Sequence, residues 1–89
     1  MLKISYLPIF IKQLKKLEQS LQEEVLEKIE IFRNPKNHKA IKVHKLHGAL
    51  SGRYSFSVNY RYRVVFIYID KKQTSVALLA FGDHSVYEK

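Results

Sequence analysis

Arginine, histidine and tyrosine side chains in the second half of the chain could act together on a phosphate. Arg63 lies inside the apolar run 62–69, so its charge must reach water or a partner. A guanidinium can bind a phosphate through two parallel hydrogen bonds. His44 and His84 can transfer protons near neutral pH, where imidazole titrates. Tyr87, three residues after His84, offers a ring that can stack on an unpaired base.

These residue types suffice to cleave RNA without a metal. A base takes the proton of the 2′-hydroxyl, an acid protonates the leaving 5′-oxygen, and a cation stabilises the charged phosphorane. His38, His44 and His47 have no carboxylate near them in the sequence, and the four histidines lack helical metal-ligand spacing, which argues against a metal site. The three glycines lie apart, so they form no phosphate-binding loop. We therefore expect neither a metal nor a cofactor.

Each candidate also has a plainer explanation. Arg63 could extend to the edge of the sheet or pair with Asp83. A single histidine such as His84 is usually structural or solvated. A functional interpretation of Arg63 and His84 is favoured because His44 and Tyr87 are also present and the chain has a basic region.

The charges of the chain are segregated. The net charge is +8, from sixteen basic and eight acidic residues, and five of the acids lie between residues 18 and 30. Residues 31–69 contain no acid and eight lysines and arginines. Such a basic half is typical of a protein that binds a phosphate backbone or an acidic partner, although a merely solvated surface is the alternative. The candidate RNA- or phosphate-binding residues of this half are Lys42, Lys45, His47, Arg53 and Arg61.

Hydrophobic periodicity predicts the elements that position these side chains. Residues 3–6 alternate as a short strand, and Pro8 suits the first turn of a helix. A second helix is expected to begin at Ser20, with Glu23 completing a capping box, and to end at Asn34-Pro35. The apolar stripes of the two helices predict an antiparallel hairpin that covers a core.

The rest of the chain predicts an antiparallel sheet. Residues 35–48 are rich in lysine and histidine, and we expect an extended arm or irregular strand on the surface. Strands are predicted at 53–58, 62–69 and 74–81, in a meander. The fold class is therefore α+β in a single domain of residues 1–89, with both helices on one face of the sheet and the other face left for function. The chain has no cysteine and no apolar stretch long enough to span a bilayer, so we expect a cytoplasmic protein with no membrane partner.

The order of elements and four sequence segments resemble the RelE/ParE superfamily of toxins from type II toxin–antitoxin modules. These segments are FIKQLKKL (10–17), RNP (33–35), KLHGALSGRYSFSVNYRYRVVF (45–66) and GDHSVYEK (82–89). The resemblance covers nearly the whole chain and implies a RelE-like microbial ribonuclease fold. It implies an endoribonuclease that cuts mRNA in the ribosomal A site without a metal and so inhibits translation. It also implies a cognate antitoxin that wraps the basic face with an acidic or amphipathic segment, and a complex of both that binds operator DNA.

The resemblance assigns roles to single residues. Arg63 matches the strand arginine that contacts the scissile phosphate in RelE-type enzymes, and His84 matches the catalytic histidine of the YafQ-like branch. Tyr87 falls where RelE-type members place a functional aromatic residue. His44 falls where YafQ-like members have a histidine and YoeB-like members an acid, which makes it the second candidate proton carrier.

The chain also departs from the family pattern. Ser55 and Ser57 stand where family nucleases often have Lys, Arg or His, and Leu7 replaces the usual Ser or Thr before the first helix. The two serines leave one role unassigned, which His44 or His47 would have to fill. Two alternatives therefore stay open, namely a ParE-like inhibitor of DNA gyrase without nuclease activity and a degenerate member that binds only antitoxin and operator.

Overall fold

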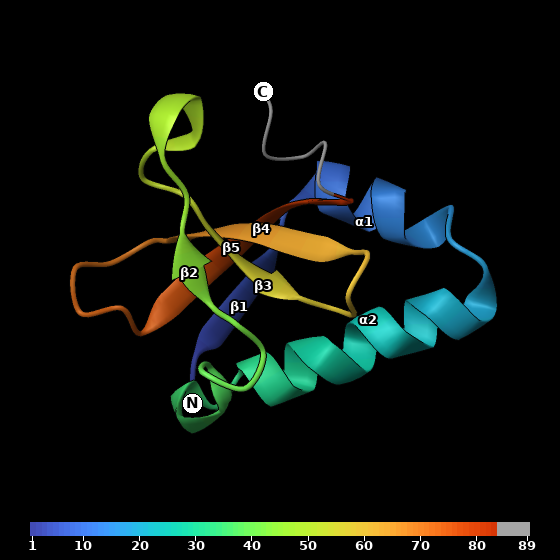
Figure 1. The fold of residues 1–89 in the computed structure, drawn as a ribbon, viewed down its shortest axis with the longest axis horizontal. Helices are drawn as coiled ribbons and strands as arrows, with labels where there is room; N and C mark the ends of the chain where they lie inside the picture. The colour runs from blue at the N-terminus through green and yellow to red at the C-terminus, as the bar shows by residue number, and fades with distance from the viewer. Residues whose placement is uncertain (84–89) are drawn as a thin grey trace.

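The computed structural model describes residues 1–83 as five strands, two helices and two short 3₁₀ turns. Figure 1 shows the strands forming one twisted sheet, with α1 and α2 running in opposite directions beside it. The elements in chain order are β1 (Lys3–Tyr6), α1 (Pro8–Lys15), α2 (Gln19–Phe32), η1 (Pro35–Asn37), β2 (His44–Lys45), η2 (Gly48–Leu50), β3 (Tyr54–Ser57), β4 (Arg63–Tyr68) and β5 (Ser75–Gly82).

The sheet has the strand order β1-β5-β4-β3-β2. Strands β2 to β5 pair in antiparallel fashion, and β1 joins β5 in parallel, with Lys3 opposite Ser75 and Tyr6 opposite Leu78. The predicted α+β class, with a strand, two helices and a three-stranded meander, is confirmed. In the described residues 1–83, no helix is long and apolar enough to cross a membrane.

The beginning of α2 differs from the sequence prediction. Ser20 lies inside the helix, and its hydroxyl donates a hydrogen bond to Glu18 Oε1 at 3.0 Å. Glu18 is the capping residue, because its extended backbone places its carbonyl where it accepts from the amides of Leu21 and Gln22. The cap was therefore predicted two residues too late. A carboxylate at a helix N-terminus is favourable, because it faces the positive end of the helix dipole.

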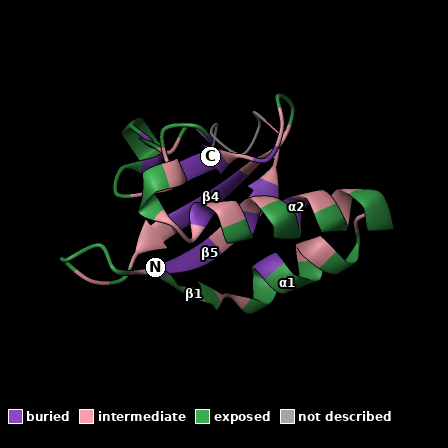
Figure 2. Cartoon of the chain, turned by 90° about the horizontal axis from the view of Figure 1, so that it is seen from below, coloured by how far each residue is buried: buried purple, intermediate pink, exposed green. Residues whose placement is uncertain are grey.

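The main core lies between the helices and one face of the sheet. Figure 2 shows α1 and α2 along one side of the buried strands β4 and β5. Phe32, at the end of α2, is fully buried, and its ring centroid lies 4.4 Å from that of Phe56 and 4.6 Å from that of Phe66. The β3–β4 hairpin therefore packs against the helices, and the predicted core beneath the two helices is confirmed. Helix α1 is tied to the sheet by a hydrogen bond of 2.8 Å from the Phe81 amide to Gln13 Oε1.

The opposite face of the sheet carries a second, smaller apolar cluster. Its buried members are Leu46, Leu50 and Val65, and η2 folds Leu50 onto the sheet. Ile41, in the same lysine-rich region, is buried in the main core. The expected surface arm of residues 35–48 is therefore anchored to the fold, because Ile41 packs in the main core and Leu46 in the smaller cluster.

An irregularity in β5 determines which residue lies opposite Arg63. Val65 pairs with Ala80 and Phe66 with Leu78, so Leu79 is an extra residue in β5. A bulge of this kind shifts the alternation of side chains by one position. Phe81 therefore faces the main core, as Leu78 does, and Gly82 pairs with Arg63.

Candidate functional site

His44 lies on the exposed face of β2 with both ring nitrogens hydrogen-bonded. Its Nδ1 lies 2.9 Å from the carbonyl oxygen of Lys42, and its Nε2 lies 3.4 Å from the hydroxyl of Ser55. A carbonyl oxygen can only accept, so Nδ1 must carry a proton. In the neutral imidazole Nε2 is then the basic nitrogen. The fold thus selects the tautomer in which Nε2 can take a proton.

The backbone of Lys42 makes this arrangement possible. Its φ of 59° lies in the left-handed region, which costs a residue with a side chain about 1–2 kcal/mol. The turn that contains it is held by bonds from Lys42 N to Lys39 O at 3.2 Å and from Val43 N to His38 O at 2.9 Å. Backbone strain of this kind is common at functional sites, where the surrounding structure imposes it. Here it directs the Lys42 carbonyl to the His44 ring.

Arg63 opens β4 and is half-buried. Its Nη1 donates to the carbonyl oxygens of Asn59 at 2.6 Å and Tyr62 at 3.0 Å. These bonds, and not an ion pair with Asp83, fix the guanidinium. Within residues 1–83, Nε and Nη2 of Arg63 have no hydrogen-bond partner. A fixed guanidinium with two unused donor groups is suited to an anion.

Asn59 organises the turn between β3 and β4 and thereby positions Arg63. Its Oδ1 accepts from the amides of Arg61 at 2.9 Å and Tyr62 at 2.8 Å, as in an Asx turn. Its Nδ2 donates to Glu24 Oε1 at 2.9 Å and so ties the turn to α2. Because its carbonyl accepts from Arg63, one residue connects helix, turn and guanidinium.

His44 and Arg63 share the face of the sheet that the helices leave open. His44 pairs with Ser55, and Ser57, two residues further along β3, pairs with Arg63. With standard strand spacings, the Cα atoms of His44 and Arg63 are roughly 12 Å apart. Side chains of this length can approach neighbouring groups of one nucleotide across that gap. The structure therefore places His44 and Arg63 around the same patch, with the two serines between them.

The other basic candidates are spread over a wider surface. Lys45 is exposed, and as the neighbour of His44 on β2 it points to the opposite side of the sheet. His47 is exposed just before η2. Arg53 precedes β3, four residues from Ser57, which is roughly 13 Å along the strand. These three side chains are not gathered around Arg63, and their role in RNA binding stays a prediction.

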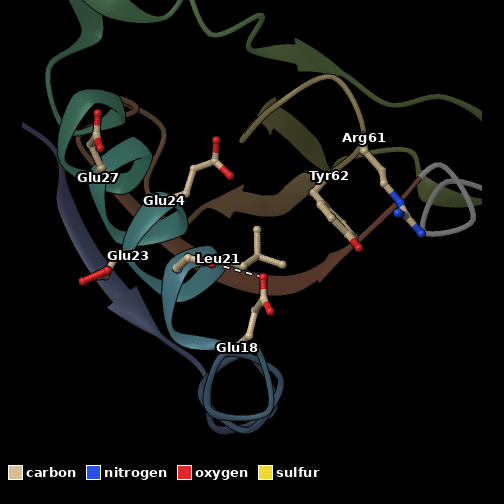
Figure 3. Close-up of a pocket in the computed structure, with 8 residues that line it drawn as sticks. Glu18, Leu21, Glu23, Glu24, Glu27, Arg61 and Tyr62 are labelled. Atoms are coloured by element: carbon tan, nitrogen blue, oxygen red, sulfur yellow. Dashed lines mark hydrogen bonds between the residues drawn. The ribbon is translucent and has the colours of Figure 1, made fainter.

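Arg61 borders a groove of opposite charge. Its guanidinium lies over the Tyr62 ring, with Cζ 5.1 Å from the ring centroid. The groove has a volume of about 540 Å³. Figure 3 shows the glutamates of α2 and of its cap, Glu18, on one side, and Arg61 and Tyr62 on the other. The acidic residues of this groove are Glu18, Glu23, Glu24 and Glu27. The groove repels phosphate, so it is not a continuation of the Arg63 site.

Two predicted catalytic residues, His84 and Tyr87, lie outside the described residues. Gly82, two positions before His84 in the sequence, is the strand partner of Arg63. Among residues 1–83 there is also no group of three or more His, Cys, Asp or Glu side chains that could hold a metal ion.

The contacts of Ser55 and Asn59 with the candidate site are not predicted from the sequence. Ser55 is fully buried, and its hydroxyl meets the imidazole of His44. In the sequence Ser55 stands out only because a basic residue is expected there, since the pairing of β2 with β3 is not visible in the sequence. Asn59 could have been found, since an Asn between two aromatic strand runs is a signal of an Asx turn.

Solved structures of toxin–antitoxin complexes contain chains with the same architecture. The chain has the fold of a chain of the archaeal RelE–RelB complex from Pyrococcus horikoshii, with 21% identity, a TM-score of 0.69 and coverage of 92% of this chain and 93% of that one. It is equally similar to a chain of the toxin–antitoxin complex RelBE2 from Mycobacterium tuberculosis, with 19% identity, a TM-score of 0.69 and coverage of 93% and 98%.

A third solved structure with the same fold is the YoeB–YefM complex from Staphylococcus aureus, with 20% identity, a TM-score of 0.69 and coverage of 94% and 98%. No family model and no curated protein matches the chain. At these identities the comparisons establish the fold, and the predicted RelE-like fold is confirmed.

Proposed function

We propose that this protein is the toxin of a type II toxin–antitoxin module and acts as a metal-independent, ribosome-dependent mRNA endonuclease. The proposal rests on one observation. An imidazole of fixed tautomer, His44, and a fixed guanidinium, Arg63, lie on the same face of the sheet, which the helices do not cover. The likeness to RelE and YoeB structures, which were solved in complexes with antitoxins, supports it.

We assign each step of RNA cleavage to one residue. His44 Nε2 takes the proton of the 2′-hydroxyl, because Nδ1 already carries a proton for Lys42. Arg63 holds the scissile phosphate through Nε and Nη2 and stabilises the charge of the phosphorane. His84 then serves as the acid that protonates the 5′-oxygen, and Tyr87 stacks on or orients a base. In this division His44 fills the role that Ser55 and Ser57 leave unassigned.

The proposed partners follow from the proposed toxin function. The substrate is mRNA in the ribosomal A site, which places the activity in the cytoplasm. A cognate antitoxin neutralises the toxin by covering the basic face of residues 31–69 with an acidic or amphipathic segment, and the complex binds operator DNA.

The proposal is tested by expressing the chain in bacteria with and without the neighbouring antitoxin gene. We expect growth arrest and shortened mRNA from the unchanged chain alone, and neither from Arg63→Ala or His84→Ala. Lys12→Gln, on an exposed part of α1, is the control and should remain toxic.

If Arg63→Ala and His84→Ala both fold and remain as toxic as the unchanged chain, these residues are not catalytic. DNA breaks with intact mRNA would support the gyrase alternative. Absence of toxicity from the unchanged chain would support the alternative that the protein has lost catalytic activity and binds only antitoxin and operator.

A further inference from the structure

A second groove lies beside Arg63, and its charge is opposite to that of the glutamate groove. It has a volume of about 370 Å³ and is formed by α2, the turn at residues 40–42 and the turn between β3 and β4. Three of its lining residues are cationic, namely Lys28, Lys42 and Arg63, and one is acidic, Glu24. The carboxylate of Glu24 accepts a hydrogen bond from Asn59, which leaves the groove with a clear positive excess.

The rim of this groove carries an exposed aromatic ring. Tyr60 occupies the tip of the β3–β4 turn, and 92% of its surface is accessible. The turn that presents it is fixed by the Asn59 bonds to Arg61, Tyr62 and Glu24. A ring held on a rigid turn beside three cations has the composition of a single-stranded nucleic-acid subsite, in which bases stack and phosphates are neutralised.

Lys42 joins this groove to the proposed catalytic imidazole. Its carbonyl fixes the tautomer of His44, while Lys42 itself lines the groove. Arg63 likewise belongs both to the groove and to the patch shared with His44. An RNA strand whose scissile phosphate lies at Arg63 would therefore continue into the groove without leaving the protein surface.

We propose that this groove holds the nucleotide adjacent to the scissile phosphate, with its phosphate between Lys28 and Lys42 and its base stacked on Tyr60. The inference rests on the proposed function for the identity of the ligand, single-stranded RNA. It adds Lys28, which lies outside the basic half of residues 31–69, and Tyr60, which lies within it, to the residues that bind the substrate. The groove on the other side of the turn cannot serve this purpose, because four glutamates line it.

The test measures binding of a short single-stranded RNA to the purified full-length chain at several salt concentrations. The RNA carries 2′-O-methyl groups throughout, so that it keeps a ribose backbone and binds without being cleaved. Lys28→Gln should weaken binding and lower the slope of log affinity against log salt by about 0.7, the value for one lost phosphate contact on a single strand. Lys12→Gln, which removes an exposed lysine of α1, should leave both quantities unchanged.

Tyr60 is tested by two matched substitutions. Tyr60→Ser removes the ring and should weaken binding at least about fivefold, whereas Tyr60→Phe retains stacking and should bind as the unchanged chain does. Because Tyr60 is so exposed, neither substitution disturbs the core.

The results distinguish failure of the subsite from failure of the nuclease function. If the unchanged chain binds no RNA, or if Lys28→Gln and Tyr60→Ser bind as tightly as Lys12→Gln, the subsite is ruled out. If binding depends on Lys28 and Tyr60 but the unchanged chain never cleaves RNA on ribosomes, the subsite stands and the nuclease function fails. If the unchanged chain cleaves mRNA and binding is indifferent to both residues, the function stands and the subsite fails.

Discussion

At the scale of single residues, a few polar side chains determine how the site is arranged. His44 owes its tautomer to a carbonyl that the left-handed backbone of Lys42 brings within 2.9 Å. Arg63 owes its position to the carbonyl of Asn59. The sequence indicates that Arg63 and His44 are candidates, because their residue types suit phosphate chemistry. It does not reveal these backbone contacts, since they depend on turn conformations that no pattern in the sequence encodes.

Asn59→Asp tests the link between α2 and the guanidinium. The aspartate keeps the Oδ1 acceptor of the turn but loses the donor to Glu24 and adds a second negative charge beside it. We expect the free energy of unfolding to fall by about 1–3 kcal/mol, because a hydrogen bond is replaced by repulsion between two carboxylates. Chemical denaturation at neutral pH measures the change.

A second substitution provides the control for Asn59→Asp. Adding Glu24→Gln returns a donor to the pair with donor and acceptor exchanged, so most of the lost stability should be recovered. If the double variant is no more stable than Asn59→Asp alone, the contact between Asn59 and Glu24 is not what holds the turn.

At the scale of elements, periodicity predicts the order and type of the helices and strands but not their pairing. Strand β1 matches its predicted bounds, and β3 to β5 fall within a residue or two of theirs. The parallel pairing of β1 with β5 joins segments about seventy residues apart, which local patterns cannot specify. The bulge at Leu79 is equally invisible, although it decides that Gly82 lies opposite Arg63. Ile41 and Leu46 were assigned to a surface arm because their neighbours are lysines and histidines.

The turn between β4 and β5 offers a test at this scale. The Asp70 carboxylate accepts hydrogen bonds from the Thr74 hydroxyl, from Thr74 N at 2.9 Å and from Ser75 N at 3.0 Å. The Thr74 hydroxyl bond, followed by these two amide bonds, lowers the Asp70 pKa below its ordinary value of 3.8. Because the folded pKa is depressed, the stabilisation is present above pH 3.8 and is lost as the pH falls through the lower folded value.

Asp70→Asn should therefore lower the melting temperature at pH 7. The difference between the variant and the unchanged chain should shrink as the pH is reduced below about 3.8. Thermal unfolding followed by circular dichroism over this pH range measures both curves. A difference that stays constant with pH would contradict the assignment of the pKa shift to folding.

At the scale of the whole molecule, the charge segregation seen in the sequence becomes two grooves on either side of one turn. The glutamates of α2 border one groove, and Lys28, Lys42 and Arg63 border the other. The composition indicates a basic half, but Lys28 belongs by sequence to the acidic helix and by structure to the basic groove. The negative charge of the acidic groove disfavours RNA binding on that side of the molecule. RNA is therefore expected on the face of the sheet that carries His44 and Arg63.

The central claim is that this patch cleaves RNA through the 2′-hydroxyl, and mapping of RNA ends on translating ribosomes tests it most directly. The unchanged chain should cut mRNA at discrete positions and leave a 2′,3′-cyclic phosphate. A single 2′-deoxy substitution before the cut bond should abolish cleavage there. Arg63→Ala should slow cleavage at least about 100-fold, because the charged phosphorane loses its guanidinium. Cleavage that persists at the 2′-deoxy position, or that is as fast with Arg63→Ala, would contradict the account.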